Sequence, residues 1–187
     1  MNHSHQTGTV TRPATAPTTT APAPLGEDIA IRRTLREDDP RAIADLHRRI
    51  YGSEYGLNER FVEGVQRGLD ACVARGWPRA GGGVWLVERR GALLGALGLT
   101  DEGDAMGRVR WLVFDPQLRG RGLGRSLVAE LVDEARAAGM RTLTLETFAA
   151  LTTAARIYRG LGFRLQWERE RRDWGPAVTF QGYRLEL

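Results

Sequence analysis

The clearest chemical signal in the sequence is the stretch Arg119-Gly-Arg-Gly-Leu-Gly124, which is followed by Arg125 and Ser126. Its three glycines permit close backbone approach and positive φ. The apolar spacing after Gly122 predicts a helix whose free N–H groups and positive dipole end face the loop. Such a helix start is suited to binding pyrophosphate. The stretch is neither a Walker A loop, because no Gly-Lys-Ser/Thr follows, nor a good dinucleotide fingerprint, and a plain glycine-rich turn is the alternative.

Metal chemistry has little support in the sequence. Cys72 is the only cysteine, which excludes an intramolecular disulfide and a multi-cysteine zinc site. Met1-Asn2-His3 could hold Cu(II) or Ni(II) through the amine, two amides and the imidazole, although an incidental histidine is the simpler interpretation. We therefore expect no metal site.

The composition of the 187 residues predicts an ordinary globular chain, with 42% hydrophobic and 27% charged residues. The net charge of +4 is mild, and every basic residue is arginine, so a nucleic-acid partner is not expected. No apolar stretch approaches the roughly 18 residues of a transmembrane helix, so no membrane association is expected. With one cysteine and no secretory signal, we expect a cytoplasmic location.

Two segments of different character divide the chain. Residues 1–26 are rich in Pro and Thr and have no apolar periodicity, which predicts a disordered tail. Residues 27–187 carry the apolar periodicity of a single folded domain.

Helix and strand signals begin immediately after the tail. Residues 29–35 alternate as in a strand, and Asp39-Pro40 resembles an N-cap followed by proline at the first helical position. Asn58 is the expected cap of a second helix, in which Gly64 and Gly68 lower helix propensity, so we expect that helix to be mobile.

The remaining elements follow in a regular order. Turn signals and apolar periods predict three strands, a helix, a strand, a helix and two strands, over residues 84–88, 92–100, 108–114, 122–139, 142–147, 151–161, 163–168 and 178–187. This order predicts a mixed α/β layer fold with both antiparallel and parallel pairing.

Three segments together carry a specific resemblance. Val113 to Gly124, Leu143 to Thr147 and Ala154 to Phe163 resemble the GNAT superfamily of acetyl-CoA-dependent N-acetyltransferases. The glycine loop is similar to that family's Arg/Gln-x-x-Gly-x-Gly/Ala pyrophosphate loop, and Tyr158 with Gly162-Phe163 is similar to its Tyr-x-x-x-Gly-Phe element. The resemblance covers about residues 28–187 and implies a central mixed sheet of six to seven strands flanked by about four helices.

A narrower resemblance involves the helical region before Asn58. Residues 46–57, with Trp85 and the segment from Thr147 to Phe163, look like the acetyltransferase half of MarR–acetyltransferase fusion regulators. The polar stretch before Glu27 is too short to hold the winged-helix half of such a protein.

The resemblance implies a binding site for acetyl-CoA as cosubstrate. The pantetheine arm would pair with the strand before the loop, and the loop would supply N–H groups to the pyrophosphate. Ser126 could add a hydroxyl, and the Arg119 and Arg121 side chains could meet the 3′-phosphate or remain solvated, which we favour. The implied cofactor-binding residues are Leu112, Val113, Phe114, Arg119, Gly120, Arg121, Gly122, Leu123, Gly124, Arg125 and Ser126.

The resemblance also implies catalytic residues. Tyr158 stands where the family has its general acid, although it lies on an apolar helix stripe and could instead be a core aromatic. Glu54 is the first candidate for the general base, with a solvated surface Glu as the alternative, and Glu146 is the second. His47 lies on an apolar face and is interpreted as a core histidine. The oxyanion would meet a backbone N–H at Val113 or Phe114.

One position departs from the family pattern. Many relatives carry Asn seven residues before the Tyr, where this chain has Leu151, so Thr152 or Thr153 could substitute. The expected reaction is acetyl transfer to a small-molecule, amino-acid or peptide amine by a monomer or homodimer. The alternative from another class is a non-catalytic acyl-CoA-binding regulatory domain.

Overall fold

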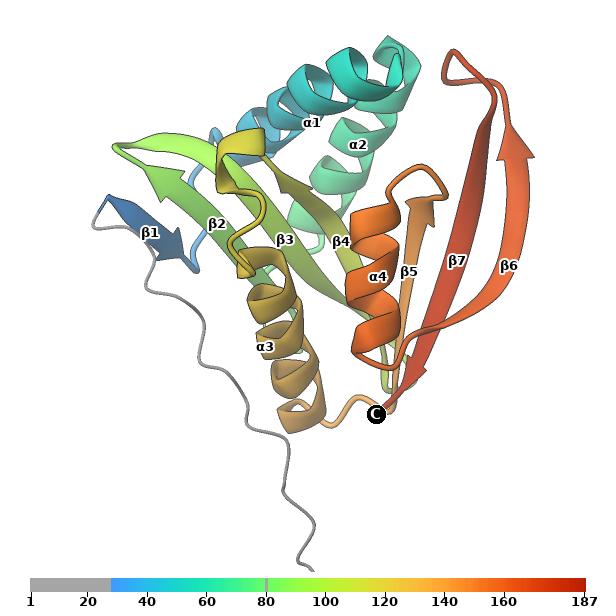
Figure 1. Cartoon of the computed structure of the whole chain (residues 1–187). Helices are drawn as coiled ribbons and strands as arrows, with labels where there is room; N and C mark the ends of the chain where they lie inside the picture. The colour runs from blue at the N-terminus through green and yellow to red at the C-terminus, as the bar shows by residue number, and fades with distance from the viewer. Residues whose placement is uncertain (1–27, 80) are drawn as a thin grey trace, which may run out of the picture.

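The computed structural model of the protein describes residues 28–79 and 81–187. The predicted tail over residues 1–26, its boundary at residue 27 and the Met1-Asn2-His3 motif lie outside these residues. Within them, the expected mixed α/β fold is confirmed, with one seven-stranded sheet and four α-helices in the described ranges (Figure 1).

The elements follow one another in the predicted order. The strands are β1 (Ile29–Arg32), β2 (Gly83–Arg89), β3 (Ala92–Gly103), β4 (Met106–Phe114), β5 (Thr142–Phe148), β6 (Arg164–Arg171) and β7 (Val178–Glu186). The helices are α1 (Asp39–Tyr55), α2 (Glu59–Ala74), α3 (Leu123–Ala137) and α4 (Thr152–Gly160), with a short 3-10 turn η1 (Pro116–Leu118) before α3. The strand order across the sheet is β1-β2-β3-β4-β5-β7-β6.

The start of α1 differs from the sequence prediction. Asp38, and not Asp39, is the N-cap residue, and β1 ends at Arg32. The Asp39 carboxylate accepts hydrogen bonds from the Arg32 guanidinium at 2.6 and 2.7 Å and from the Arg36 backbone N–H at 2.5 Å. These donors outweigh the burial of Asp39 and hold the pKa of its carboxyl below the usual value. Asp39 therefore joins the end of β1 to α1.

The second helix begins as predicted. The Asn58 side chain accepts a hydrogen bond from the Arg60 backbone N–H at 3.0 Å, which makes Asn58 the N-cap of α2. Leu69 and Cys72 on the same helix are buried, at 0% and 1% exposure. These two residues anchor α2 on the sheet.

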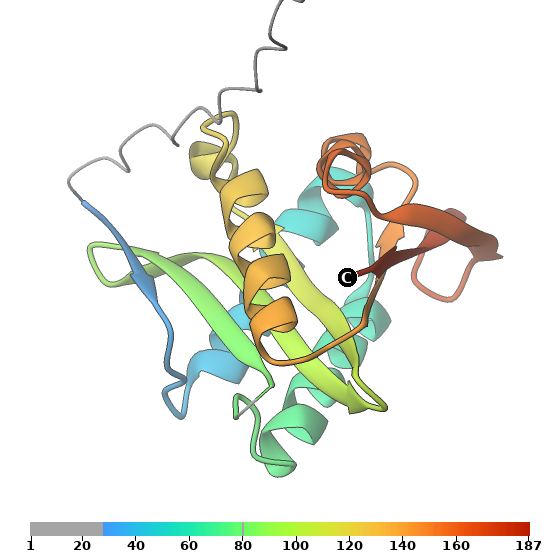
Figure 2. The same ribbon diagram turned by 90° about the horizontal axis from the view of Figure 1, so that it is seen from below.

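Two layers of helices cover the two faces of the sheet, and Figure 2 shows α3 and α4 on one side with α1 and α2 on the other. One apolar core joins the stripes of α3 and α4 to the sheet, with Leu127 and Tyr158 among its members. The other joins α1 and α2 to the opposite face, with Ile43 and Leu69 among its members. Both cores include residues from strands on each side of the β4–β5 junction.

The junction between β4 and β5 is short and then opens. The two strands pair in parallel only from Met106 to Arg108, opposite Thr142 to Thr144. Beyond these three positions they diverge, toward the end of the sheet where η1 and α4 lie (Figure 1). A register shift between β3 and β4 accompanies the divergence, and Trp111 there has a φ of +54°. The bulge turns β4 away from β5 and leaves one edge of β4 without a strand partner.

Candidate active site

The glycine loop between η1 and α3 forms an open cradle of backbone. Gly120 and Gly122 have φ of +75° and +74°, and a Cβ atom at either position would meet nothing within 4 Å. Gly122 is the N-cap residue of α3, and the first hydrogen bond within the helix runs from the Ser126 N–H to the Gly122 carbonyl. The N–H groups of the three residues between them have no acceptor within the helix. This geometry suits an anionic group, as the sequence predicted.

The free edge of β4 lies beside this loop. Leu112 and Phe114 are half-buried, and Val113 is 3% exposed. The Leu112 carbonyl accepts a hydrogen bond from the Tyr51 hydroxyl at 3.2 Å, and the Phe114 carbonyl accepts from the Arg119 guanidinium at 3.2 Å. Side-chain donors thus occupy these two carbonyls, and a ligand that lies along the edge like an added strand would replace them or pair with the remaining backbone groups.

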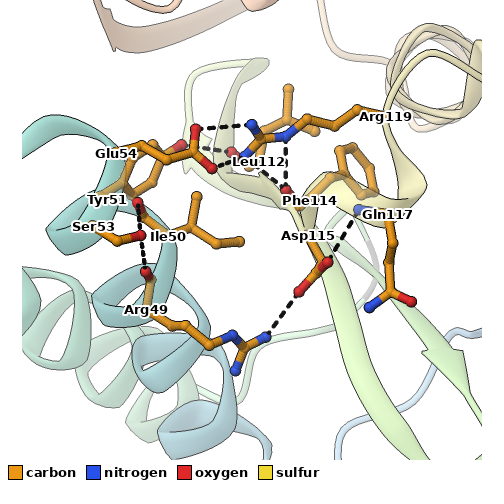
Figure 3. Close-up of polar contacts among 10 residues, drawn as sticks. All are labelled: Arg49, Ile50, Tyr51, Ser53, Glu54, Leu112, Phe114, Asp115, Gln117 and Arg119. Atoms are coloured by element: carbon orange, nitrogen blue, oxygen red, sulfur yellow. Dashed lines mark hydrogen bonds and ion pairs between the residues drawn. The ribbon is translucent and has the colours of Figure 1, made fainter.

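Ion pairs between side chains join the end of α1 to the segment that leads into the glycine loop (Figure 3). The Glu54 carboxylate receives two hydrogen bonds of 2.8 Å from the Arg119 guanidinium, in a bidentate ion pair. A second ion pair joins Arg49 of α1 to Asp115 at 3.3 Å. The hydrogen bonds from Arg119 to Glu54 raise the pKa of the Arg119 guanidinium above its usual value, so this guanidinium keeps its charge. The sequence favoured a solvated Arg119 side chain, but the structure pairs this side chain with Glu54.

A pocket of about 250 Å³ occupies the space between β4 and β5, and we call it the β4–β5 pocket. It is lined by residues of α1, α2, β4, β5, α4 and β7, and Tyr158 belongs to its wall. The Tyr158 side chain is 4% exposed, with its ring against Phe163 and Tyr183 at 5.8 and 6.1 Å between centroids. Its hydroxyl makes no hydrogen bond to the described residues. Tyr158 is thus both a core ring and a pocket residue, which the sequence treated as alternatives.

Burial raises the pKa of Tyr158 well above the ordinary value of a phenol. The hydroxyl therefore keeps its proton across the physiological pH range. A protonated phenol facing a pocket is able to donate a proton to a leaving group that forms there.

The comparisons with known proteins agree with this geometry. The model of the Acetyltransferase (GNAT) family matches residues 42–163. The chain belongs to this family. The uncharacterized N-acetyltransferase YjgM of Escherichia coli is 31% identical over 137 residues, which are 71% of this chain and 80% of that protein. The IAA acetyltransferase of Azospirillum brasilense is 37% identical over 95 residues, which are 49% of this chain and 58% of that protein.

Solved structures extend the match to the whole GNAT fold. The structure of yncA from Salmonella typhimurium with its cofactor acetyl-CoA has a TM-score of 0.63 to this chain at 20% identity. The match covers 86% of this chain and 95% of that chain. At this identity the likeness concerns the fold.

The candidate acid–base residues of this GNAT chain are distributed unevenly around the pocket. Glu146 lines the pocket and forms an ion pair with Arg108 at 2.8 Å, whereas Glu54 is engaged with Arg119 and is not among the lining residues. His47 is buried, and its Nδ1 lies 2.8 Å from the Ile43 carbonyl oxygen, so Nδ1 carries the proton. Burial lowers the pKa of His47 to about 4, and the ring is neutral at pH 7. It is a core histidine, as predicted, whose ring also reaches the pocket wall.

The position that departs from the family pattern also lies at the pocket. Leu151 lines it and is the N-cap residue of α4, without a side-chain cap. Thr152 and Thr153 are exposed on the first turn of α4, and no side-chain hydrogen bond holds either of them among the described residues. A substitute role for these threonines in cofactor binding stays a prediction.

Several pocket residues carry no clear signal in the sequence. Arg110, Trp111 and Trp174 line the pocket, together with Phe180. Trp174 and Phe180 come from the β6–β7 hairpin, 60 or more residues after the end of β4. Only the strand alternation of Arg108 and Arg110 offered a signal, since it places both side chains on one face of β4.

The sequence predicted neither a metal site nor a membrane-spanning helix, and the structure bears on both. In the described ranges no group of three or more His, Cys, Asp or Glu side chains could hold a metal ion. No helix in the part of the chain that the structure describes is long and apolar enough to cross a membrane. Cys72 is buried, and its thiol accepts a hydrogen bond from Arg110 at 3.2 Å.

Proposed function

We propose that this GNAT protein is an acetyl-CoA-dependent N-acetyltransferase that acetylates a primary amine of a small molecule, an amino acid or a peptide. The observation that carries this proposal is the position of Tyr158, whose phenol faces a pocket that opens where β4 and β5 separate. Acetyl-CoA supplies the activated acetyl thioester. The residues of this chain bind it, orient it and move the protons of the reaction.

The residues proposed to hold acetyl-CoA fit its chemistry. The open backbone at Gly120 and Gly122 leaves room for two phosphates, and the helix start behind it provides N–H donors and a positive dipole. The free edge of β4 from Leu112 to Phe114 can pair with the amide groups of the pantetheine arm. Ser126, on the first turn of α3, is half-buried and can add its hydroxyl.

Acetyl transfer needs a neutral amine that attacks the thioester carbonyl, after which the C–S bond breaks. We assign Tyr158 as the general acid that gives its proton to the departing sulfur, because its phenol is protonated and faces the pocket. The backbone N–H of Val113 or Phe114 is the proposed donor to the oxygen that becomes negative. The proton released by the amine is taken up by a carboxylate or by water.

Two carboxylates are candidates for this base. Glu54 is the first, and it becomes available when the cofactor phosphates attract Arg119, its present ion-pair partner. Glu146 already lines the pocket, although Arg108 offsets its charge. Replacing each carboxylate by its amide and measuring kcat at several pH values distinguishes the two.

A second candidate function is a non-catalytic acyl-CoA-binding regulatory domain, in line with the resemblance to fusion regulators. The specific observation in its favour is that Glu54 is occupied by Arg119 and does not line the pocket. Such a domain would bind CoA with the same affinity whether or not an amine is present, and it would not release CoA from acetyl-CoA.

The experiment is a thiol-release assay with acetyl-CoA across a broad panel of amines, together with calorimetry of CoA binding. CoA binding with amine-dependent thiol release supports the enzyme. CoA binding without release by any amine favours the regulatory domain. Absence of CoA binding contradicts both.

A further inference from the structure

The far wall of the β4–β5 pocket is built from aromatic rings. Tyr51, Phe61, Phe148, Trp174 and Phe180 all line it, although they come from α1, α2, β5 and the β6–β7 hairpin. The rings pack on one another in tilted and edge-to-face pairs, with centroids 5.2 Å apart for Phe61 and Trp174 and 4.6 Å for Phe148 and Phe180. Such pairs present apolar edges and faces that suit an aromatic or bulky apolar group.

The wall formed by α2 carries no side chains at two positions. Gly64 and Gly68 both line the pocket, one helical turn apart. A Cβ at Gly64 would approach only the end of the Arg67 side chain, at 4.0 Å, and a Cβ at Gly68 would touch the Trp111 ring at 4.0 Å. Each glycine costs the helix about 1 kcal/mol relative to alanine. At Gly68 the Trp111 ring lies close to the helix, whereas the surface at Gly64 is open and leaves space that an acceptor side group can fill.

The charges in the wall do not cancel. Arg108 and Glu146 neutralise each other at 2.8 Å, and the His47 ring is neutral. Arg110 remains, half-buried, with the Cys72 thiol as its hydrogen-bond partner at 3.2 Å and no ion pair to a described carboxylate. A thiol is a weak acceptor, so this guanidinium lacks the carboxylate or phosphate that suits its donors. The pocket therefore favours a ligand with a negative group over a polyamine.

We propose that the acceptor of this site is a small α-amino acid with an aromatic or bulky apolar side chain, whose carboxylate binds Arg110. This inference rests on the proposed function and names its substrate class. The side chain packs between the ring wall and the glycine face of α2, and the amino group lies toward Tyr158. The volume of about 250 Å³ is below the roughly 300–1,000 Å³ of pockets for larger ligands, which agrees with a small acceptor.

The substrate test compares three amines in the thiol-release assay with acetyl-CoA. L-Phenylalanine carries both recognition groups, L-phenylalaninamide lacks only the carboxylate, and spermidine is a polycation without either group. We expect kcat/KM for L-phenylalanine to exceed that for the amide by about 10- to 100-fold, as for a lost hydrogen bond to a charged group. Spermidine should be slower than both.

Variants of the two recognition elements follow the same assay. Arg110→Met should lower kcat/KM for L-phenylalanine to the level of its amide and leave the amide within about threefold, whereas Arg110→Lys should restore part of the difference. Gly64→Leu should lower turnover of L-phenylalanine more than that of L-alanine, because the leucine side chain fills the space proposed for the phenyl ring of the substrate. Arg164→Met removes one positive charge on the exposed face of β6, outside the pocket, and is the matched control.

Calorimetry of CoA binding accompanies every variant, so that a folding defect is recognised as loss of CoA affinity. Equal turnover of L-phenylalanine and its amide by the wild type, or faster turnover of spermidine, overturns the amino-acid assignment while the acetyltransferase function stands. An unchanged acid-to-amide ratio in Arg110→Met, with CoA affinity retained, overturns the role of Arg110. No turnover of any amine in a protein that binds CoA overturns the proposed function itself.

Discussion

Replacing Tyr158 by Phe separates the packing of its ring in the core from its proposed role as general acid. The substitution keeps the ring that packs on Phe163 and Tyr183 and removes only the hydroxyl that faces the β4–β5 pocket. If the phenol protonates the departing thiolate, kcat should fall by about 10²- to 10⁴-fold, the usual contribution of a general acid. This loss corresponds to about 3–5 kcal/mol of transition-state stabilisation.

The same change should hardly affect folding. The Tyr158 hydroxyl makes no hydrogen bond to the described residues, so its loss leaves no buried partner unsatisfied. We expect the free energy of unfolding to stay within about 0.5 kcal/mol of the wild type and Tm within about 2 °C. CoA affinity, measured by calorimetry, should also be unchanged.

Tyr183→Phe is the matched control, because it removes a buried hydroxyl that does have partners. That hydroxyl donates to the Gln181 side-chain oxygen and accepts from Arg159, both at 3.1 Å. Its loss should cost about 1 kcal/mol, or about 2–4 °C in Tm, with kcat unchanged. Tyr158→Phe should therefore lower kcat and leave Tm nearly unchanged, whereas Tyr183→Phe should lower Tm and leave kcat unchanged.

The rate–pH profile of the wild type provides a further check on Tyr158. Since burial raises the pKa of its phenol, ionisation of Tyr158 should cause no loss of kcat below about pH 10. A turnover number for Tyr158→Phe within a few-fold of the wild type, with chemistry shown to be rate-limiting, would refute the catalytic role. Water or the amine itself would then be the proton source.

Three other perturbations test the cradle, the base and the start of α1. Gly122→Glu should abolish CoA binding in calorimetry, whereas Gly139→Glu should not, because it adds the same charge at a similar positive φ at the far end of α3. Glu54→Gln should lower kcat by about 10²-fold or more if Glu54 is the base, and an unchanged kcat would exclude it. The ionised Asp39 carboxylate, held by Arg32, stabilises the fold above its ordinary pKa near 4, and this contribution is lost as the pH falls through the lowered pKa. In urea denaturation, Asp39→Asn should therefore be less stable than the wild type at pH 7 and approach it as the pH falls through the lowered pKa.

The elements of the fold were predictable because their signals are local. Asn58 caps α2, as the sequence indicated, and Gly139, the last residue of the predicted range, follows the Ala138 C-cap of α3 with a φ of +80°. The extension of β3 to Gly103 was missed, because the turn to β4 uses Asp104 and Ala105 at positive φ. Hairpin turns of this kind are usually marked by Asn-Gly or Asp-Gly, and alanine gives no such signal.

The contacts around the site were not predictable for a different reason. Glu54 and Arg119 are 65 residues apart, and only the packing of α1 against the end of β4 brings them together. The bulge at Trp111 also lacks a local signal, since a tryptophan at positive φ is rare and no glycine marks the position. The sequence therefore identified which segments carry the functional motifs. The pocket that these segments form together became visible only in the three-dimensional structure.

The short junction between β4 and β5 has a consequence for the energetics of turnover. Three paired positions, from Met106 to Arg108, are the whole backbone ladder between two parts of the sheet, and side-chain cores on both faces hold those parts together. In the proposed reaction the pantetheine arm lies along the open edge of β4 and completes the sheet there. Each catalytic cycle then adds one strand-like segment to the fold and removes it again. Release of CoA must break the backbone hydrogen bonds that this segment makes with β4, so the rate of turnover depends on this step as well as on the proton transfer at Tyr158.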